Sequence, residues 1–195
     1  MEKIDFKKTL KSLYHAKDAI AEVDAGMGIY LAVEGQGAPG GEAYAEAIGK
    51  IYGVAYTLKF SLKNAGVMDF AVCSLETLYH DDPAEVPMDE WRWVVLIRIP
   101  EAVTEKQIQD AVTAIKVRKN LDASDVKRME LKEGRSLQVM HIGPYNEVGE
   151  IYDRLIAHMR ENELVITGPP HEIYLSDPRR VAPEKLKTIV RIPVK

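Results

Sequence analysis

Glu172 and Tyr174 stand two residues apart in the segment "HEIYLSDPRR" at residues 171–180, which has the composition of a strand that ends in an Asp-Pro turn. Alternate side chains of a strand point to opposite faces, so Glu172 and Tyr174 share one face while Ile173 and Leu175 share the other. The apolar pair indicates a core. A carboxylate next to a phenol can activate a water molecule or pair with a bound cation, and both interpretations stay open.

Two further polar side chains come from the segment "MHIGPYNEVG" at residues 140–149. Tyr145 follows a Gly-Pro turn, so its ring either packs on the next helix or reaches a ligand with its hydroxyl group. His141 shares strand parity with Leu137 and Val139. This parity favours a hydrogen-bonded core histidine over a catalytic one, and His141 is kept as a ligand-binding candidate.

Aromatic side chains form a third group of candidates. Trp91 and Trp93 are two residues apart and share a strand face. They are either core residues or the wall of a site for flat or cationic ligands. Tyr79, Tyr174 and Tyr44 are weaker candidates for the same wall.

Other kinds of site are not supported by the sequence. The five histidines are scattered without the spacing of metal ligands, so we expect no metal site. The loop "GQGAPG" at residues 35–40 matches a dinucleotide-binding pattern, but no acidic residue follows at the required distance. No nucleophile motif or phosphate-binding loop occurs. We therefore predict chemistry without a cofactor.

Composition limits the class of protein and its partners. Of the 195 residues, 46% are hydrophobic and 29% are charged, which is typical of a soluble globular protein. A single cysteine, Cys73, in a strand-like apolar setting fits a buried thiol and a reducing cytoplasm. The net charge of −4 and the lack of a long apolar run predict no direct nucleic-acid or membrane contact. A small molecule is the expected partner; monomer and dimer both remain open.

The expected elements form a repeat. Hydrophobic periodicity predicts a short helix near 5–14, long helices over 42–63 and 147–162, and a helix that begins at Thr104 with a capping box. Strands are expected at these segments: 28–33, 69–80, 90–100, 125–132, 136–142, 171–176 and 187–194. The order strand-helix-strand-strand occurs twice. "GEAY" at 41–44 is echoed by "GEIY" at 149–152, and "LIRIP" at 96–100 by "IVRIP" at 189–193.

This repeat predicts an α+β fold made of two halves, about 1–103 and 104–195, which together form one domain. The halves would pack about a pseudo-twofold axis with a central ligand cleft. Aligning the two Asp-Pro turns places Tyr79 opposite Tyr174 and Thr77 opposite Glu172. The second half alone then offers a carboxylate at that position.

The motifs "MHIGPYNEVG", "HEIYLSDPRR", "PEKLKTIVRIPV", "AYTLKF" and "EWRWVVLIRIPEAVT" resemble the stand-alone GyrI-like small-molecule-binding proteins over nearly the whole chain. The resemblance implies tandem strand-helix-strand-strand halves around a ligand cleft. Family members include effector-binding domains of multidrug-sensing transcription regulators, in which an acidic residue meets lipophilic cations. Other stand-alone members hydrolyse cyclopropane-bearing, DNA-alkylating natural products.

Carried over residue by residue, the resemblance implies that Glu172 activates water and that Tyr145 assists it as a second catalytic residue. Trp91 and Trp93 match the strand that supplies the aromatic wall. In one departure, "LETLYH" at 75–80 stands where hydrolase-like relatives read "LEGLWW", so Tyr79 and His80 replace two tryptophans.

The sequence therefore favours a hydrolase that binds lipophilic, electrophilic or cationic compounds and opens a strained ring. The alternatives are a non-catalytic sequestering protein and the effector-sensing module of a regulator. About 27 residues precede the first expected strand, which we expect to be too few for a helix-turn-helix unit and its linker, and this disfavours the regulator alternative.

Overall fold

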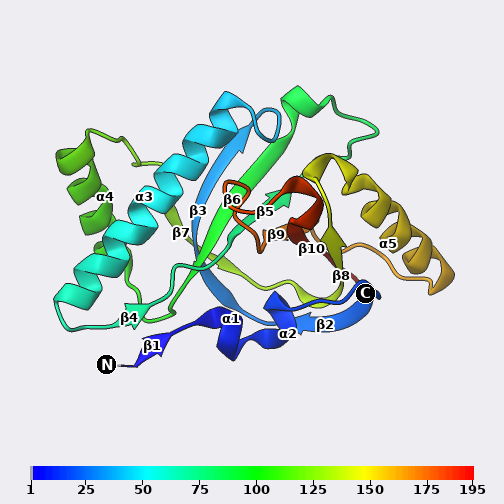
Figure 1. Cartoon of the computed structure of the whole chain (residues 1–195), viewed down its shortest axis with the longest axis horizontal. Helices are drawn as coiled ribbons and strands as arrows, with labels where there is room; N and C mark the ends of the chain where they lie inside the picture. The colour runs from blue at the N-terminus through cyan, green and yellow to red at the C-terminus, as the bar shows by residue number, and fades with distance from the viewer. Residues whose placement is uncertain (1) are drawn as a thin grey trace. The chain divides into compact units, whose positions relative to one another are not determined.

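The computed structural model describes residues 2–195, and the chain divides into two compact α+β units. The first unit comprises residues 2–6, 28–73 and 77–131, and the second comprises residues 7–27, 74–76 and 132–195. Figure 1 shows the path of the chain through both. The α+β class predicted from the sequence is confirmed in each unit.

The first unit contains four neighbouring strands in the order β5-β6-β3-β7, in which β6 and β7 both pair antiparallel with β3. Its strands are β3 (Gly28–Gln36), β5 (Leu75–Tyr79, whose first two residues belong to the second unit), β6 (Arg92–Ile99) and β7 (Lys127–Leu131). A separate parallel pair joins β1 (Lys3–Ile4) to β4 (Asp69–Phe70). A short 3₁₀ turn, Met88–Glu90, precedes β6.

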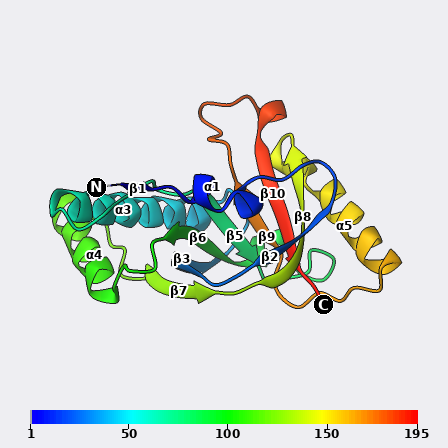
Figure 2. The same cartoon turned by 90° about the horizontal axis from the view of Figure 1, so that it is seen from below.

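Two helices, α3 (Glu42–Asn64) and α4 (Glu105–Lys119), pack against each other in the first unit, α3 on β3 and β6 and α4 on β7. Figure 2 shows both on the same side of these strands. The buried hydrophobic side chains of α3 recur at three- and four-residue steps, as its hydrophobic pattern predicts: Tyr44, Ala47, Ile51, Val54, Ala55, Leu58 and Leu62.

The predicted capping box at the start of α4 is confirmed. The Thr104 hydroxyl accepts a hydrogen bond from the Gln107 amide, and the Gln107 side chain accepts one from the Thr104 amide. These bonds satisfy donors that the first helical turn otherwise leaves unpaired.

The second unit contains an antiparallel sheet in the order β2-β8-β10-β9. Its strands are β2 (Ala21–Ala25), β8 (Gly134–Ile142), β9 (His171–Tyr174) and β10 (Lys187–Pro193). Its helices are α2 (Lys11–Tyr14) and α5 (Gly149–Glu161), with 3₁₀ turns at Tyr145–Glu147 and Pro183–Lys185. The short α1 (Phe6–Thr9) lies where the chain passes from the first unit to the second.

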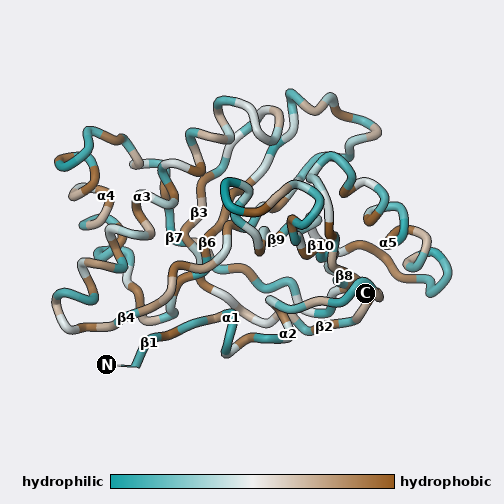
Figure 3. The backbone as a smooth tube through the Cα atoms, in the orientation of Figure 1, coloured by the Kyte–Doolittle hydropathy of each residue, from teal (hydrophilic) through white to brown (hydrophobic). Residues whose placement is uncertain are grey.

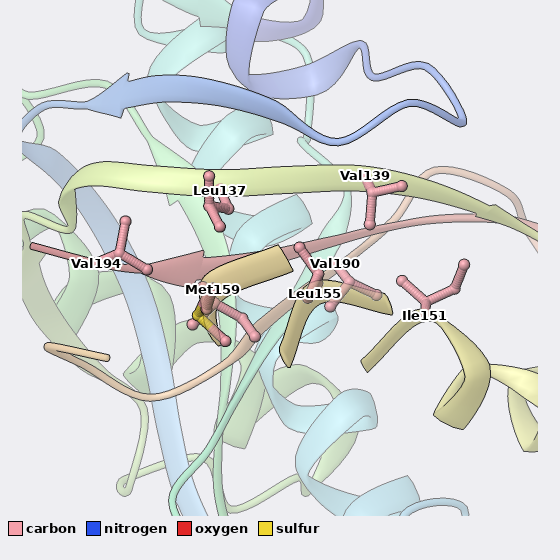
Figure 4. Packing of buried hydrophobic residues seen from close by; sticks show 8 residues of the cluster. Leu137, Val139, Ile151, Leu155, Met159, Val190 and Val194 are labelled. Atoms are coloured by element: carbon pink, nitrogen blue, oxygen red, sulfur yellow. The ribbon is translucent and has the colours of Figure 1, made fainter. Parts of the chain in front are cut away.

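Helix α5 packs against this sheet with its apolar face. Its hydrophilic and hydrophobic residues alternate along the tube in Figure 3. The resulting core, drawn in Figure 4, joins three residues of α5 to residues of β8 and β10 and to Val194: Leu137, Val139, Ile151, Leu155, Met159, Val190, Ile192 and Val194. The packing places α5 on the face of β9 and β10 that carries Glu172 and Val190, which are register partners.

The predicted strand-helix-strand-strand repeat is present in both units. In the first, β3 is followed by α3, the short β4, β5 and β6; in the second, β8 is followed by α5, β9 and β10. In each case the last strand lies between the other two, in the orders β3-β6-β5 and β8-β10-β9. The predicted pseudo-twofold axis and central cleft stay predictions.

The compact units do not coincide with halves divided near residue 103. Strand β2 precedes β3 in the sequence but pairs with β8, and β7 precedes β8 but pairs with β3. Each strand-helix-strand-strand set therefore receives its fourth strand from the other half of the sequence. The expected strand over 69–80 is likewise two short strands, β4 and β5.

Candidate functional site

Glu172 is the centre of a group of polar and aromatic side chains in the second unit. It lies in β9 and is only 7% exposed. The hydroxyl of Tyr152, from α5, donates a hydrogen bond to Oε1 at 2.9 Å. The hydroxyl of Tyr174, two residues along β9, donates to Oε2 at 2.9 Å. The carboxylate is thus held in one orientation by two phenols.

Burial raises the pKa of the Glu172 carboxyl above its ordinary value, because desolvation disfavours the charged form. The hydrogen bonds from Tyr152 and Tyr174 act in the opposite direction, as do the nearby imidazoles of His141 and His171, but they do not outweigh burial. A carboxylate with a raised pKa is a stronger proton acceptor than one exposed to water. It is also an effective counter-charge for a cation that shares its dry surroundings.

Tyr145 reaches the same group through its ring. Its centroid is 5.4 Å from that of Tyr174, with the two planes at 78°. The 3₁₀ turn that carries it is held by His141, whose Nε2 lies 3.0 Å from the Pro144 carbonyl oxygen and therefore carries the proton. Gly143 has φ of +149°, a conformation that favours glycine, and a Cβ there would come within 3.2 Å of the His141 ring.

Four of the sequence-predicted residues are thus brought together: Glu172, Tyr174, Tyr145 and His141. His141 is buried and hydrogen-bonded, in line with the core role that its strand parity favours. It positions the turn before Tyr145.

The remaining predicted residues form two aromatic pairs in the first unit. Trp93 is 2% exposed and packs edge-on against Tyr44, with ring centroids 5.0 Å apart. Trp91 is half-buried, and its ring centroid lies 6.0 Å from that of Tyr79. Trp93 is therefore a core residue of the first unit, and the ligand-binding wall that these four residues were expected to form stays a prediction.

The glycine-rich loop at 35–40 holds Trp93. A Cβ at Gly35 would come within 2.2 Å of the indole ring, so this position must lack a side chain. The indole N–H donates to the Gly37 carbonyl at 3.0 Å, and the Gly37 amide donates to the Trp91 carbonyl at 2.9 Å. The backbone of this loop thus approaches the indole ring closely and packs against it.

Tyr152 was missed as a site residue, although the repeat contains the signal for it. "GEAY" and "GEIY" make Tyr44 the counterpart of Tyr152, and the two Asp-Pro turns make Thr77 the counterpart of Glu172. In the structure the Tyr44 hydroxyl is 2.7 Å from Oγ1 of Thr77, just as that of Tyr152 is bonded to Glu172. Each unit thus has a helix tyrosine bonded to the equivalent strand residue, with a carboxylate only in the second.

A buried ionic network, which the sequence did not reveal, lies on the other face of β9. His171 is fully buried, and its Nδ1 is 3.0 Å from Oε1 of Glu133 while its Nε2 is 3.0 Å from Oε2 of Glu76. The Arg191 guanidinium, 2% exposed, lies 2.9 Å from the other oxygen of Glu133. Two carboxylates therefore face two cations directly behind Glu172.

These partners shift the pKa values of the network. Burial alone favours the neutral imidazole, but the carboxylates of Glu133 and Glu76 outweigh it and raise the pKa of His171 to about 9. Burial alone also favours a neutral Glu133, yet His171 and Arg191 lower the pKa of that carboxyl to about 2. His171 and Glu133 are thus both charged at neutral pH.

We expect wild-type stability to fall as pH rises through about 9. The folded pKa of His171 exceeds its ordinary value of 6.5, so its contribution is complete below pH 6.5 and is lost above pH 9. The shift corresponds to a loss on the order of 3 kcal/mol, measurable by urea unfolding from pH 6 to pH 10. His171→Gln should be less stable at pH 6 and lack most of this pH dependence; an equal slope in both proteins would contradict the assignment.

Two general features complete the description of residues 2–195. No helix in this range is both long enough and apolar enough to cross a bilayer. Nor does this part of the chain gather three or more His, Cys, Asp or Glu side chains that could hold a metal ion.

Solved structures provide close matches. An uncharacterized conserved protein from Listeria innocua is 36% identical, with a TM-score of 0.92 over 99% of this chain and 100% of that one. A protein described as a hydrolase, also from Listeria innocua, is 37% identical with a TM-score of 0.88 over 99% and 100% of the two chains. The C-terminal domain of EcmrR is 15% identical with a TM-score of 0.61 over 93% and 98%, a likeness of fold. No curated protein matches significantly.

The family comparison agrees with the fold and with the motifs around Glu172 and Tyr145. Residues 29–195 match the GyrI-like small molecule binding domain, a range that includes both strand-helix-strand-strand sets. The chain belongs to the GyrI-like small-molecule-binding domain family.

Proposed function

We propose that this protein is a cofactor-independent hydrolase of lipophilic, electrophilic small molecules, and that cyclopropane-bearing alkylating compounds are its substrate class. The observation that carries the proposal is the buried carboxylate of Glu172, with its raised pKa and its two phenol partners. The hydrolase description of two Listeria innocua proteins, each at least 35% identical over the whole chain, supports the reaction class.

In the proposed reaction Glu172 removes a proton from a water molecule while the water oxygen attacks a ring carbon of the substrate. A carbon–oxygen bond forms and a carbon–carbon bond of the strained ring breaks. The electron pair of the broken bond passes to a carbonyl oxygen conjugated with the ring. Tyr145 donates a hydrogen bond to that oxygen. The enolate then takes up a proton from solvent, and the proton held by Glu172 is returned to solvent, so that one water molecule is added overall.

Turnover by the wild-type protein tests this proposal. A cyclopropane conjugated to an aryl ketone is incubated with the protein in isotopically labelled water, and the ring-opened product is followed by mass spectrometry. We expect multiple turnovers per protein, with the label in the new hydroxyl group. A rate equal to the protein-free background, or a product covalently attached to the protein, would contradict hydrolysis.

A second candidate function is sequestration of lipophilic cations without turnover. It is favoured by the same carboxylate lying beside the rings of Tyr145 and Tyr174, because aromatic faces and a desolvated anion both attract a cation. A quaternary ammonium dye and its neutral isostere, in which a quaternary carbon replaces the nitrogen, separate the two functions. Preference for the dye, together with background rates of ring opening, would make sequestration the function.

A further inference from the structure

A groove lies between α3 and α4 of the first unit, apart from the residues around Glu172. Its volume is about 430 Å³, within the range of small-molecule sites, roughly 300–1,000 Å³. The side chains that matter for its chemistry are three aromatic residues of α3 and two cations of α4: Tyr52, Tyr56, Phe60, Arg118 and Lys119.

The aromatic residues form a ladder along one side of α3. They follow each other at four-residue steps, which places them on the same helix face. Adjacent centroids are 6.2 Å and 6.5 Å apart, and the ring planes differ by only 25° and 21°. Tyr56 and Phe60 are 49% and 51% exposed. Three near-parallel rings at the surface form a continuous apolar strip, the kind of patch that marks a binding surface.

Two glycines of α3 complete the floor of the groove. A Cβ at Gly53 would come within 2.4 Å of Ile115 Cδ1, so α3 and α4 approach closely because this position is glycine. A Cβ at Gly49 would meet no atom within 4 Å. Glycine lowers helix stability relative to alanine, and at Gly49 no packing requirement within the chain explains it. The residue leaves open space beside Tyr52.

The charged side chains that line the groove are positive, which favours an anion as its ligand. Arg118 and Lys119 belong to the last turn of α4, and both are exposed. Among residues 2–195 no carboxylate pairs with either, and no acidic residue lines the groove. A symmetric contact between two copies would bring these cations together without an acidic partner in the groove, which disfavours a second copy as the occupant.

We propose that this α3–α4 groove binds small planar aromatic anions, with the ring of the ligand against Tyr56 and Phe60 and its acid group on Arg118 and Lys119. Aromatic stacking and a charge-assisted hydrogen bond at opposite ends of one ligand account for both halves of the lining. The preference is opposite in sign to that of the Glu172 group, so the site does not depend on the proposed hydrolase activity.

Calorimetric titration with naphthalene-1-sulfonate tests the site, with naphthalene-1-sulfonamide as the neutral isostere. We expect one saturable site for the sulfonate and at least tenfold weaker binding of the sulfonamide. Phe60→Gln and the double variant Arg118→Gln/Lys119→Gln should each weaken sulfonate binding at least tenfold. Val117→Gln, an exposed apolar position on α4 outside the groove, and Lys106→Gln, at the other end of α4, should leave it unchanged.

Gly49→Leu separates ligand exclusion from misfolding. The leucine fills the open space, and it should raise the thermal midpoint because glycine is a poor helix former. We expect a more stable protein that no longer binds the sulfonate. Equal affinities for sulfonate and sulfonamide, unchanged binding by Gly49→Leu, or conversion of a dimer to a monomer by Phe60→Gln in sedimentation would each overturn the proposal.

Discussion

Replacing Arg191 by methionine is expected to lower the free energy of unfolding by about 3–5 kcal/mol, because it removes one of the two buried cations that compensate the buried carboxylate of Glu133. The guanidinium is 2% exposed and bonds to Glu133 at 2.9 Å, to the Leu13 carbonyl at 2.7 Å and to Gln138 at 3.2 Å. Methionine keeps much of the volume but none of these donors. Urea unfolding followed by circular dichroism, at pH 6 where His171 is charged, measures the difference.

The matched control is Arg154→Met, which removes an exposed arginine that bonds to Asp18 in the same unit. Its urea midpoint should stay close to that of the wild type, since exposed ion pairs contribute little. If Arg191→Met does not fold, the double variant Arg191→Met/Glu133→Gln keeps the test decisive, because it also removes the carboxylate that has lost its arginine partner and should regain part of the stability. A single variant as stable as the Arg154 control would contradict a buried network.

Much of the fold could be predicted because its signals are local. The three- and four-residue steps of α3 and the capping box at Thr104 depend on residues close in the sequence. Strand β2 was missed because "AEVDA" alternates weakly, with four of its five residues at least partly exposed. Its pairing with β8, like that of β7 with β3, joins segments distant in the sequence, which periodicity cannot reveal.

The candidate site likewise contains residues that local sequence patterns reveal and residues that they do not. Glu172 and Tyr174 were selected from strand alternation together with the repeat and the family resemblance. Tyr152 of α5 could have been selected too, because the "GEAY" and "GEIY" repeat makes it the counterpart of Tyr44. His171 could not, because its charge depends on Glu76 and Glu133, which belong to other segments of the chain. A buried histidine beside one carboxylate and a surface histidine look alike in a sequence.

If the protein is a hydrolase, Glu172→Gln is expected to lower kcat/KM for ring opening by about 10²–10⁴-fold, the usual contribution of a general base. Glutamine preserves the shape of the side chain: its carbonyl oxygen can accept a hydrogen bond from one of the two hydroxyls, Tyr152 or Tyr174, and its amide can donate one to the other. It cannot take a proton from water. Glu161→Gln, an exposed position at the end of α5, is the control and should retain the wild-type rate. Loss of cation affinity without any change in turnover would assign Glu172 to counter-charge.

The pH profile distinguishes a base from a residue that only shapes the site. Because Glu172 must be ionised to act, kcat/KM should rise with pH through the pKa of its carboxyl, which burial raises above the ordinary value. Tyr152→Phe removes a hydrogen bond that favours the charged form, so it should move this rise to higher pH. Tyr56→Phe, on α3, should not move it. If Tyr152→Phe lowers the maximum of kcat/KM but leaves the midpoint of the pH profile unchanged, base catalysis by Glu172 is contradicted. The Tyr152 hydroxyl would then have a purely structural role.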